Sequence, residues 1–268
     1  MSATPLLELR GIDKHFGPVQ VLREVAFSAH PGEVTALVGD NGAGKSTLVK
    51  CISGIYPTDA GEVFFDGNPV NIHNPRDAAG LGIEVVYQDL ALCDNLDIVQ
   101  NMFLGREKRS GLVLDEPTME QMAAETLAGL SVRTVKSVRQ LVASLSGGQR
   151  QTVAIAKAVL WNSRLVILDE PTAALGVAQT AQVLELVRRL ADKGLAVVLI
   201  SHNMNDVFAV ADRVAALYLG QMVAQVKTTD ITHAQIVELI TAGRSGDLGL
   251  ATENGSEYAD TTTPGADA

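Results

Sequence analysis

Short apolar runs of strand length alternate along the chain with longer segments in which apolar residues recur every three or four positions. Residues 45–55 and 177–192 follow this helical period, and residues 214–219 and 222–226 predict a closing hairpin around Gly220. The other runs that predict strands are residues 33–38, 62–65, 83–87, 165–168 and 196–200. This alternation is typical of an α/β protein with a parallel sheet.

The strand-length runs stop between about residues 89 and 144. Within this stretch, residues 97–104 and 118–130 follow the helical period. The pattern predicts a helical subdomain inserted into the α/β core, and insertions of this kind often carry contacts to partners.

Composition narrows the class of protein. The chain has 268 residues, of which 47% are hydrophobic and 19% charged, enough to build one large domain or a domain with an inserted subdomain. No apolar run reaches the 18 residues that a membrane-spanning helix needs, and the N-terminal residues lack a signal-peptide pattern, so a soluble cytosolic chain is expected. The net charge of −10 and the aromatic content of 4% disfavour nucleic acid as a partner.

Residues 244–268 differ from the rest of the chain. They are rich in Gly, Thr and Ala and hold five acidic side chains against a single arginine. We expect residues 1–243 to form the folded domain and residues 244–268 to be an acidic disordered tail.

A glycine-rich motif of the form G-x-x-x-x-G-K-[ST] follows the predicted strand 33–38 and precedes the predicted helix 45–55. Its glycines let backbone N–H groups surround a phosphate at a helix N-terminus, Lys45 can neutralise phosphate charge, and the Ser46 hydroxyl can bind Mg²⁺. The alternative is an ordinary glycine-rich turn with a surface lysine. The predicted phosphate-binding residues are Gly39, Asp40, Asn41, Gly42, Ala43, Gly44, Lys45, Ser46 and Thr47.

The sequence LDEPT occurs twice, at residues 114–118 and 168–172. A phosphate-binding loop needs an acidic residue on a neighbouring strand to hold Mg²⁺. The second copy ends a buried-strand pattern, so we expect Asp169 to hold Mg²⁺ and Glu170 to orient or deprotonate an attacking water. The first copy leads into a helical pattern, and we interpret Asp115 and Glu116 as structural residues that start that helix.

The segment Leu145-Ser146-Gly147-Gly148-Gln149 completes a set of motifs that resembles the ATP-binding-cassette ATPases over about residues 6–243. The resemblance implies a P-loop NTPase core with a parallel sheet, an N-terminal antiparallel β subdomain and an inserted helical subdomain. It also implies that Ser146, Gly147, Gly148 and Gln149 contact the γ-phosphate of ATP held by a second copy of the chain, through N–H groups at a helix start.

Three further positions match the family. Phe16 resembles the aromatic residue that stacks on adenine, although a plain core residue is the alternative. Gln88 resembles the glutamine that binds Mg²⁺ and reports on the γ-phosphate to the membrane partner. His202 resembles the histidine that contacts the γ-phosphate, and the resemblance gives it, Gln88 and Glu170 the catalytic roles.

One position departs from the family pattern. Gly176 stands where an aspartate usually crosses the dimer interface, so that role is not expected of this chain.

The resemblance implies an ATP hydrolase on the cytoplasmic face of the cell membrane, with ATP and Mg²⁺ bound between two head-to-tail copies. Within the family, the chain is similar to single-cassette importers of simple sugars. A separate membrane permease, expected to dock near residues 89–106, and indirectly a sugar-binding protein would be the partners. The alternatives are a soluble cassette ATPase of the cluster-assembly type and a regulatory cassette that does not hydrolyse ATP.

Overall fold

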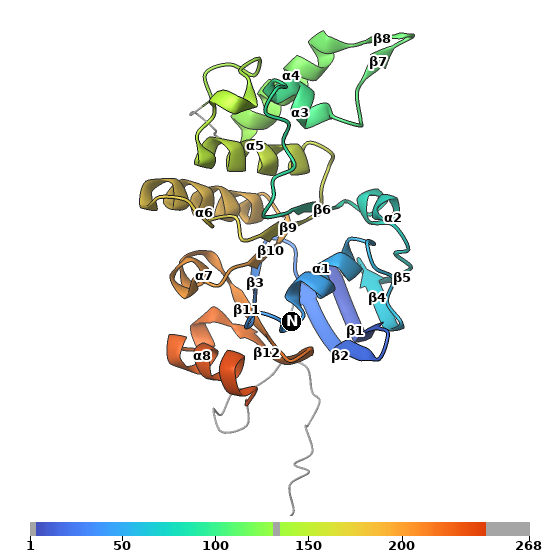
Figure 1. Cartoon of the computed structure of the whole chain (residues 1–268), viewed down its shortest axis with the longest axis vertical. Coiled ribbons are helices and arrows are strands. Elements are labelled where there is room, and N and C mark those ends of the chain that lie inside the picture. The colour runs from blue at the N-terminus through green and yellow to red at the C-terminus, as the bar shows by residue number, and fades with distance from the viewer. Residues whose placement is uncertain (1–3, 131–134, 245–268) are drawn as a thin grey trace, which may run out of the picture.

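A six-stranded sheet forms the centre of the computed structural model, which describes residues 4–130 and 135–244 (Figure 1). Its strands lie in the order β12-β11-β3-β10-β9-β6, and all neighbours from β11 to β6 are parallel, while β12 is antiparallel to β11. The strands are β3 (Val34–Val38), β6 (Ile83–Val86), β9 (Leu165–Asp169), β10 (Ala196–Ile200), β11 (Arg213–Tyr218) and β12 (Gln221–Lys227). The predicted parallel sheet is confirmed.

The central strands are apolar because both faces of the sheet are covered. Every residue of β3 and of β10 is buried, and a strand buried on both faces shows a continuous apolar run. Such runs are visible in the sequence. The predicted turn around Gly220 is also confirmed, since Leu219 and Gly220 both have positive φ and join Tyr218 to Gln221 as a two-residue hairpin loop.

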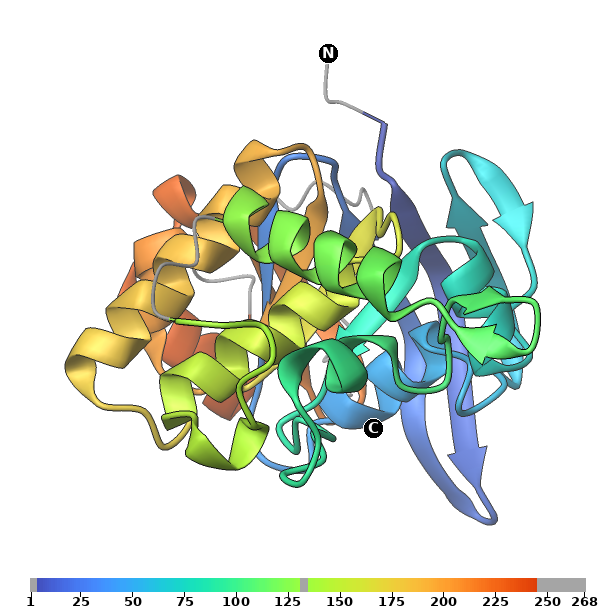
Figure 2. The ribbon, with the colours of Figure 1, turned by 90° about the horizontal axis from the view of Figure 1, so that it is seen from above.

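A second, antiparallel sheet lies beside the first in the order β2-β1-β4-β5. It consists of β1 (Leu7–Phe16), β2 (Val19–Ala29), β4 (Ala60–Phe65) and β5 (Asn68–Val70). Helix α1 (Lys45–Ile52) packs its apolar side chains against buried residues of this sheet and of the central one, in one shared core. Figure 2 shows the long ribbons of β1 and β2 at one side of the molecule. The antiparallel subdomain implied by the resemblance is therefore present.

Most of the remaining helices cover the opposite face of the central sheet, and several of them share a core with it. In Figure 1, α3, α4 and α5 lie above the sheet, and α7 and α8 lie at its lower left. The helices are α2 (Pro75–Gly80), α3 (Ile98–Phe103), α4 (Glu116–Gly129), α5 (Gly147–Val159), α6 (Val177–Asp192), α7 (Met204–Val210) and α8 (His233–Ala242), with 3₁₀ helices η1 (Val142–Ser144) and η2 (Thr228–Asp230).

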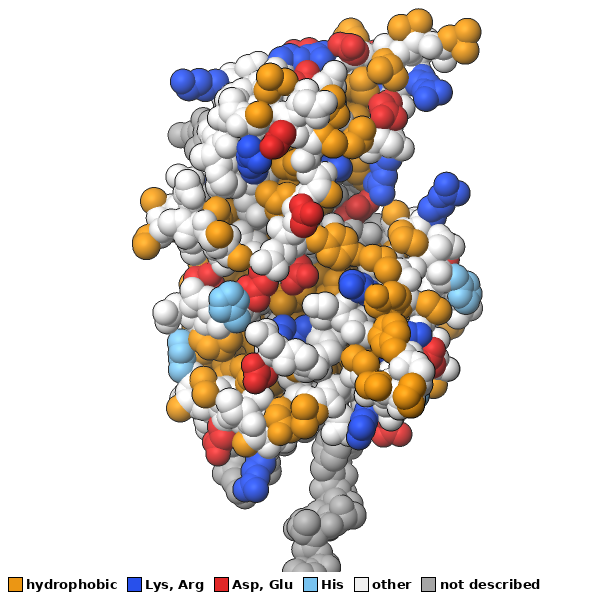
Figure 3. Space-filling model, in the orientation of Figure 1, with side chains coloured by type: hydrophobic (Ala, Val, Ile, Leu, Met, Phe, Trp, Pro, Cys, Tyr) orange, Lys and Arg blue, Asp and Glu red, His pale blue; other side chains and the backbone are white. Residues whose placement is uncertain are grey.

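The insertion between residues 89 and 144 contains α3 and α4 as expected, but it is not entirely helical. Strands β7 (Arg109–Ser110) and β8 (Val113–Leu114) form a hairpin around Gly111, whose φ is 66°. Leu112 at its tip is fully exposed, and Figure 3 shows apolar side chains at the upper right, where Figure 1 places this hairpin. Two-residue strands are too short to produce an alternating pattern, so the sequence did not reveal them.

Helix α1 ends at Ile52, three residues before the predicted end. Gly54 turns the chain with a φ of 73°, and a Cβ atom there would lie 2.4 Å from the carbonyl oxygen of Asn74. The left-handed conformation of Gly54 ends the helix, and the close approach of the two backbones leaves no room for a Cβ atom at this position. Among the described residues, no helix is long and apolar enough to cross a membrane.

The tail was predicted to be disordered. Apart from Arg244, its residues lie outside the described part of the chain.

Candidate functional site

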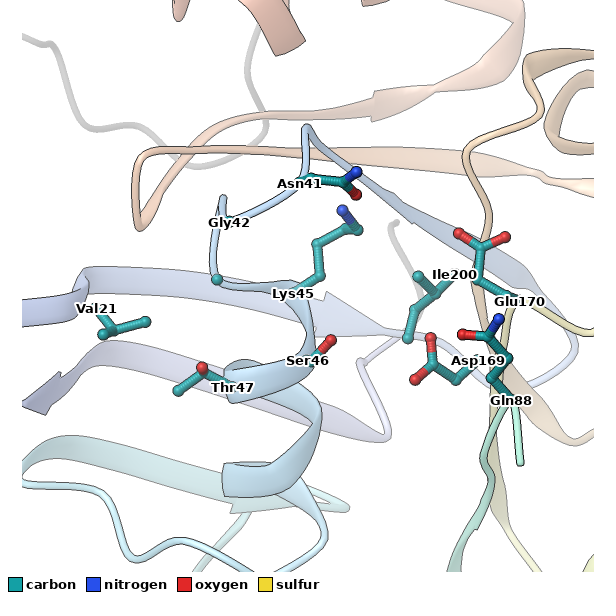
Figure 4. Close-up of a pocket in the computed structure, with 11 residues that line it drawn as sticks. Val21, Asn41, Gly42, Lys45, Ser46, Thr47, Gln88, Asp169, Glu170 and Ile200 are labelled. Atoms are coloured by element: carbon teal, nitrogen blue, oxygen red, sulfur yellow. The ribbon is translucent and has the colours of Figure 1, made fainter. Parts of the chain in front are cut away.

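The predicted phosphate-binding loop and the second LDEPT segment meet at the carboxyl ends of the parallel strands. The loop follows β3, Asp169 ends β9, and His202 follows β10. Since Ile200 pairs with Asp169 in the sheet, the ends of β9 and β10 are level. Between these elements lies a cavity of about 360 Å³ (Figure 4). It is lined by Val21, Asn41, Gly42, Gly44, Lys45, Ser46, Thr47, Gln88, Asp169, Glu170 and Ile200.

Two glycines of the loop cannot be replaced without moving their surroundings. A Cβ atom on Gly39 would lie 2.4 Å from the carbonyl oxygen of Leu217 on β11. Gly44 has a φ of 108° and is the N-cap of α1, and its Cβ would lie 2.9 Å from the side chain of Leu22. The loop is thus held between β11 and β2, with the first N–H groups of α1 at its end, where the helix dipole favours an anion.

Lys45 is held by the loop itself. Its Nζ donates hydrogen bonds to the carbonyl oxygens of Gly39 at 2.7 Å and Asp40 at 3.0 Å. Burial lowers the pKa of Lys45, while the carboxylates of Glu170, Asp40 and Asp169 act in the opposite direction. A half-buried ammonium group bonded to two neutral carbonyl oxygens is well suited to pairing with an incoming phosphate.

Asp169 faces Ser46 across the cavity, as Figure 4 shows, and Gln88 lies beside it. Burial raises the pKa of the Asp169 carboxyl, and the neighbouring Glu170 raises it further. A hydroxyl, an amide oxygen and a carboxylate are oxygen donors of the kind that Mg²⁺ prefers, and a cation would relieve the unfavourable charge on Asp169. The residues predicted to hold Mg²⁺ therefore fit the ion. No cluster of three or more His, Cys, Asp or Glu that could hold a metal occurs in residues 4–130 and 135–244.

Glu170 and His202 form a direct pair at the edge of the cavity. The Nδ1 atom of His202 lies 2.8 Å from Oε2 of Glu170, within hydrogen-bonding distance. Glu170 has a φ of 51°, and its backbone N–H donates to the carbonyl oxygen of Ile200 at 3.0 Å. A non-glycine residue with positive φ carries backbone strain, which is found most often at functional sites.

Other predicted residues lie away from this cavity. Phe16 does not line it. This ring is 42% exposed at the end of β1 and packs edge-on against Tyr56, with 5.1 Å between the ring centroids. Val21 and Ile200 do line the cavity, and sequence reasoning missed both. They are ordinary apolar strand residues, so residue type alone carried no signal for them.

The LSGGQ segment begins helix α5 and is not among the residues that line the cavity. Ser146 is the N-cap, and Gln149 completes a capping box in which its Oε1 accepts the N–H of Ser146 at 2.9 Å. This N–H group is therefore already hydrogen-bonded within the chain. Gly147 and Gly148 occupy the first two helical positions, whose N–H groups have no acceptor within a helix. Their N–H groups remain suited to bind an anion from another molecule.

The first LDEPT copy has a structural role, as predicted. Asp115 is the N-cap of α4, where its Oδ1 accepts the backbone N–H of Thr118 at 3.3 Å, and Pro117 occupies the first turn.

Gly176, the position that departs from the family pattern, lies at the start of a helix. Gly176 is the N-cap of α6 without a side-chain cap, and its φ is −75°. In the described part of the chain, no heavy atom other than those of Gly176 and its two chain neighbours lies within 4 Å of a Cβ built there.

Comparison with known proteins agrees with this geometry. The family model described as ABC transporter matches residues 22–173. The fructose import ATP-binding protein FrcA of Rhizobium meliloti is 44% identical, with 91% of this chain and 96% of that protein covered. The xylose/arabinose import ATP-binding protein XylG of Sulfolobus acidocaldarius is 43% identical, with 91% and 97% covered. A solved dimeric ATP-binding cassette in a post-hydrolysis state bound to ADP and Pi has a TM-score of 0.69 at 25% identity, with 83% and 98% covered. The chain therefore belongs to the ABC transporter family.

Proposed function

We propose that this chain is the ATP-hydrolysing subunit of an importer of simple sugars. The observation that carries the proposal is the cavity that unites Lys45 and Ser46 with Asp169 and Glu170, the last of which is bonded to His202. A cation for phosphate, oxygen donors for Mg²⁺ and a carboxylate that can take a proton from water are the groups that phosphoryl transfer to water requires.

ATP binding follows from the loop and the helix that it starts. The ammonium group of Lys45 moves from the carbonyl oxygens of Gly39 and Asp40 to the β- and γ-phosphates, and the N–H groups at the start of α1 bind the β-phosphate. Mg²⁺ would be held by Ser46, Gln88 and Asp169. It would neutralise the negative charge that develops on the transferred phosphoryl group. The exposed Phe16 ring stacks on the adenine.

Hydrolysis depends on Glu170. Its carboxylate orients the attacking water and accepts a proton from it, and positioned general bases typically contribute about a hundredfold to ten-thousandfold to a rate. His202 is hydrogen-bonded to that carboxylate, and we assign to its ring the contact with the γ-phosphate.

The LSGGQ segment requires a second copy of the chain. Ser146, Gly147, Gly148 and Gln149 lie outside the P-loop cavity of their own chain, so they meet ATP held by the partner in a head-to-tail dimer. The similar solved cassette that is dimeric with ADP and Pi supports this arrangement. Two ATP molecules then bridge the two copies of the chain, and hydrolysis of ATP allows the two copies to separate.

The relatives indicate the cargo and the other partners. Proteins named for import of fructose and of xylose or arabinose match nearly the full length of this chain. A permease would dock near Gln88 and residues 89–106, at the cytoplasmic face of the membrane, and a sugar-binding protein would deliver the sugar to it. A regulatory cassette without hydrolysis would require the loss of Lys45, Asp169, Glu170 or His202, and all four are present. A cluster-assembly ATPase would purify without a permease.

Nucleotide-dependent dimerisation tests the proposed ATP cycle. Glu170→Gln is expected to keep ATP binding and to form a long-lived dimer with ATP, because the bridge of nucleotide is no longer hydrolysed. Lys45→Ala is the matched control that cannot hold the phosphates and stays monomeric. Light scattering of the purified full chain with ATP and Mg²⁺ measures both. A Glu170→Gln chain that hydrolyses ATP at the normal rate contradicts the proposal.

Sugar uptake tests the transport role separately. In cells whose own copy is replaced by Lys45→Ala, uptake of labelled fructose, xylose or ribose is expected to be lost and to return with the unchanged chain. Unchanged uptake of all simple sugars in the variant cells contradicts the importer assignment while leaving the ATP cycle intact.

A further inference from the structure

Asp206 lies in the first turn of α7. Its carboxylate accepts one hydrogen bond from the loop that carries Glu170 and one from the loop that carries His202. It is only 6% exposed and does not line the cavity. Its Oδ2 accepts the hydroxyl of Thr172 at 2.6 Å, and its Oδ1 accepts the side-chain amide of Asn203 at 3.0 Å. Thr172 and Asn203 are 31 residues apart in the sequence, so this carboxylate joins two distant segments beyond the point where the pairing of β9 and β10 ends at Asp169 and Ile200.

The first of the two segments carries Glu170. After β9 the chain turns sharply, with Glu170 at a φ of 51° and with the N–H of Ala173 donating to the carbonyl oxygen of Glu170 at 3.1 Å. Thr172 is part of this turn, two residues after Glu170. Holding the Thr172 hydroxyl therefore restrains the backbone from which the Glu170 side chain projects.

The second segment carries His202. The next residue, Asn203, donates its N–H to the hydroxyl of Ser201 at 3.1 Å and caps α7 by accepting the N–H of Asn205 at 3.0 Å. The His202 side chain itself is 76% exposed, and it pairs with Glu170. The orientation of the imidazole ring thus depends on its backbone, which Asn203 and Asp206 restrain.

We propose that Asp206 is a positioning residue that sets the distance between Glu170 and His202 by holding both loops to one buried carboxylate. The inference rests on the proposed function, in which Glu170 activates the attacking water. A misplacement of about 1 Å in a reacting group can cost about a hundredfold in rate. Loss of the carboxylate also leaves the Thr172 hydroxyl and the Asn203 amide without their acceptor, and such groups move until they find another.

Removal of one bond at a time tests the proposal without emptying the pocket. Thr172→Val keeps the shape of the side chain but deletes the hydroxyl, whereas Thr172→Ser keeps the hydroxyl. We expect Thr172→Val to lower kcat for ATP hydrolysis about tenfold, Asp206→Ala to lower it by about ten- to a hundredfold, and Thr172→Ser to restore most of the rate. KM for ATP should stay within about twofold in all three, since the P-loop that binds the phosphates is on another element.

The matched control is Asp212→Ala. Asp212 lies beyond the other end of α7 and likewise accepts two hydrogen bonds, from the N–H of Val34 at 2.8 Å and from Arg188 at 2.7 Å. Its loss should lower thermal stability without lowering kcat. If Asp212→Ala lowers kcat as much as Asp206→Ala at equal loss of stability, or if Thr172→Ser is as slow as Thr172→Val, the role of Asp206 is merely structural and the proposal is wrong.

A double-mutant cycle completes the test. Because Thr172 and Asp206 act through the same hydrogen bond, the Thr172→Val/Asp206→Ala chain should be no slower than Asp206→Ala alone, and fully additive losses contradict the proposal. Failure of this inference is distinguishable from failure of the proposed function. Glu170→Gln chains that retain hydrolysis overturn the proposed function, whereas normal kcat in Asp206→Ala and Thr172→Val, with hydrolysis abolished by Glu170→Gln, overturns only the role of Asp206.

Discussion

The same five residues, Leu-Asp-Glu-Pro-Thr, occur twice in this chain and form two different structures. At residues 168–172 the string ends a buried parallel strand, and its two carboxylates line the cavity. At residues 114–118 it ends an exposed two-residue strand and starts helix α4, with Asp115 as the N-cap. The role of the string therefore depends on the segment before it and on the strands that lie beside it.

The two copies also lead into different structures. After the first copy, the helix begins at once with Glu116 and Pro117 in its first turn, where an acid and a proline are both favoured. After the second copy, the chain makes a turn at Glu170 and Thr172, and the next helix begins only at Val177. A part-buried hydrogen bond from the Thr172 hydroxyl to Asp206 joins that turn to α7.

Replacement of the aspartate by asparagine should give the largest difference in hydrolysis rate between the two copies. Asp169→Asn is expected to lower ATP hydrolysis by about a hundredfold or more, because metal stabilisation of phosphoryl charge is worth several kcal/mol. Asp115→Asn should hydrolyse normally, since asparagine caps a helix as well as aspartate does. Phosphate release at a series of Mg²⁺ concentrations measures both, and equal rates in the two variants break the comparison.

The same pair predicts an opposite effect on stability. Burial and Glu170 raise the pKa of Asp169, so its charged form disfavours the fold in the absence of ligands. Neutral Asn at this position should raise the thermal midpoint of the ligand-free chain at neutral pH, whereas Asp115→Asn should leave it unchanged. The gain should shrink as the pH falls and Asp169 takes up its proton. A lower midpoint for Asp169→Asn contradicts this interpretation.

The threonines of the two copies should differ about tenfold in their effect on kcat. Thr172→Val removes the bond to Asp206, while Thr118→Val alters an exposed side chain at the start of α4. Steady-state kcat of the two variants, measured side by side, separates the positioning hydroxyl from the surface one. Equal kcat for both variants would leave the bond to Asp206 without a role in the reaction.

Removal of the cap at the first copy should affect only stability. Asp115→Ala is expected to cost about 1 kcal/mol of unfolding free energy, as losses of N-cap residues typically do. Hydrolysis should stay at the normal rate. Urea denaturation followed by circular dichroism measures the first quantity, and an activity assay in the absence of urea is its control. A drop in kcat without loss of stability would assign the first copy a role in the site.

Addition of a cap after the second copy should give the smallest change. Gly176 is the N-cap of α6 and has room for a side chain, so Gly176→Asp should stabilise the fold by a few tenths of a kcal/mol, about the difference between Gly and Asp caps. The midpoints of urea denaturation of the unchanged chain and of Gly176→Asp measure this gain, provided that the two transitions have the same dependence on urea concentration. Destabilisation would show that α6 does not begin at Val177 with Gly176 as its cap.

The sequence predicted those features that depend on local pattern. Strands β3, β9 and β10 are continuous apolar runs because both their faces are buried, and the glycine and lysine spacing of the P-loop marks its own position. Strands β1 and β2 were not predicted from the sequence. Shifts of register interrupt their pairing between Leu9 and His15, and these shifts also interrupt the alternation of apolar and polar residues. The resemblance to the family, rather than periodicity, indicated that sheet.

Residues that act through distant contacts could not be predicted. Asp206 occurs in the first turn of a helix, where an acidic residue is favoured for its interaction with the helix dipole alone. Its partner Thr172 is 34 positions earlier. Only the fold brings the two together, and the same holds for Val21, which reaches the cavity because β2 passes beside the P-loop.

One measurement tests the role of Glu170 most directly: the rate of phosphate release from ATP by two glutamate variants under identical conditions. Glu170→Gln and Glu116→Gln make the same chemical change in the same five-residue string. We predict that Glu170→Gln loses about a hundredfold or more of the rate, as expected for loss of a general base, and that Glu116→Gln hydrolyses ATP as the unchanged chain does. Normal hydrolysis by Glu170→Gln, or an equal loss in both variants, would contradict that role.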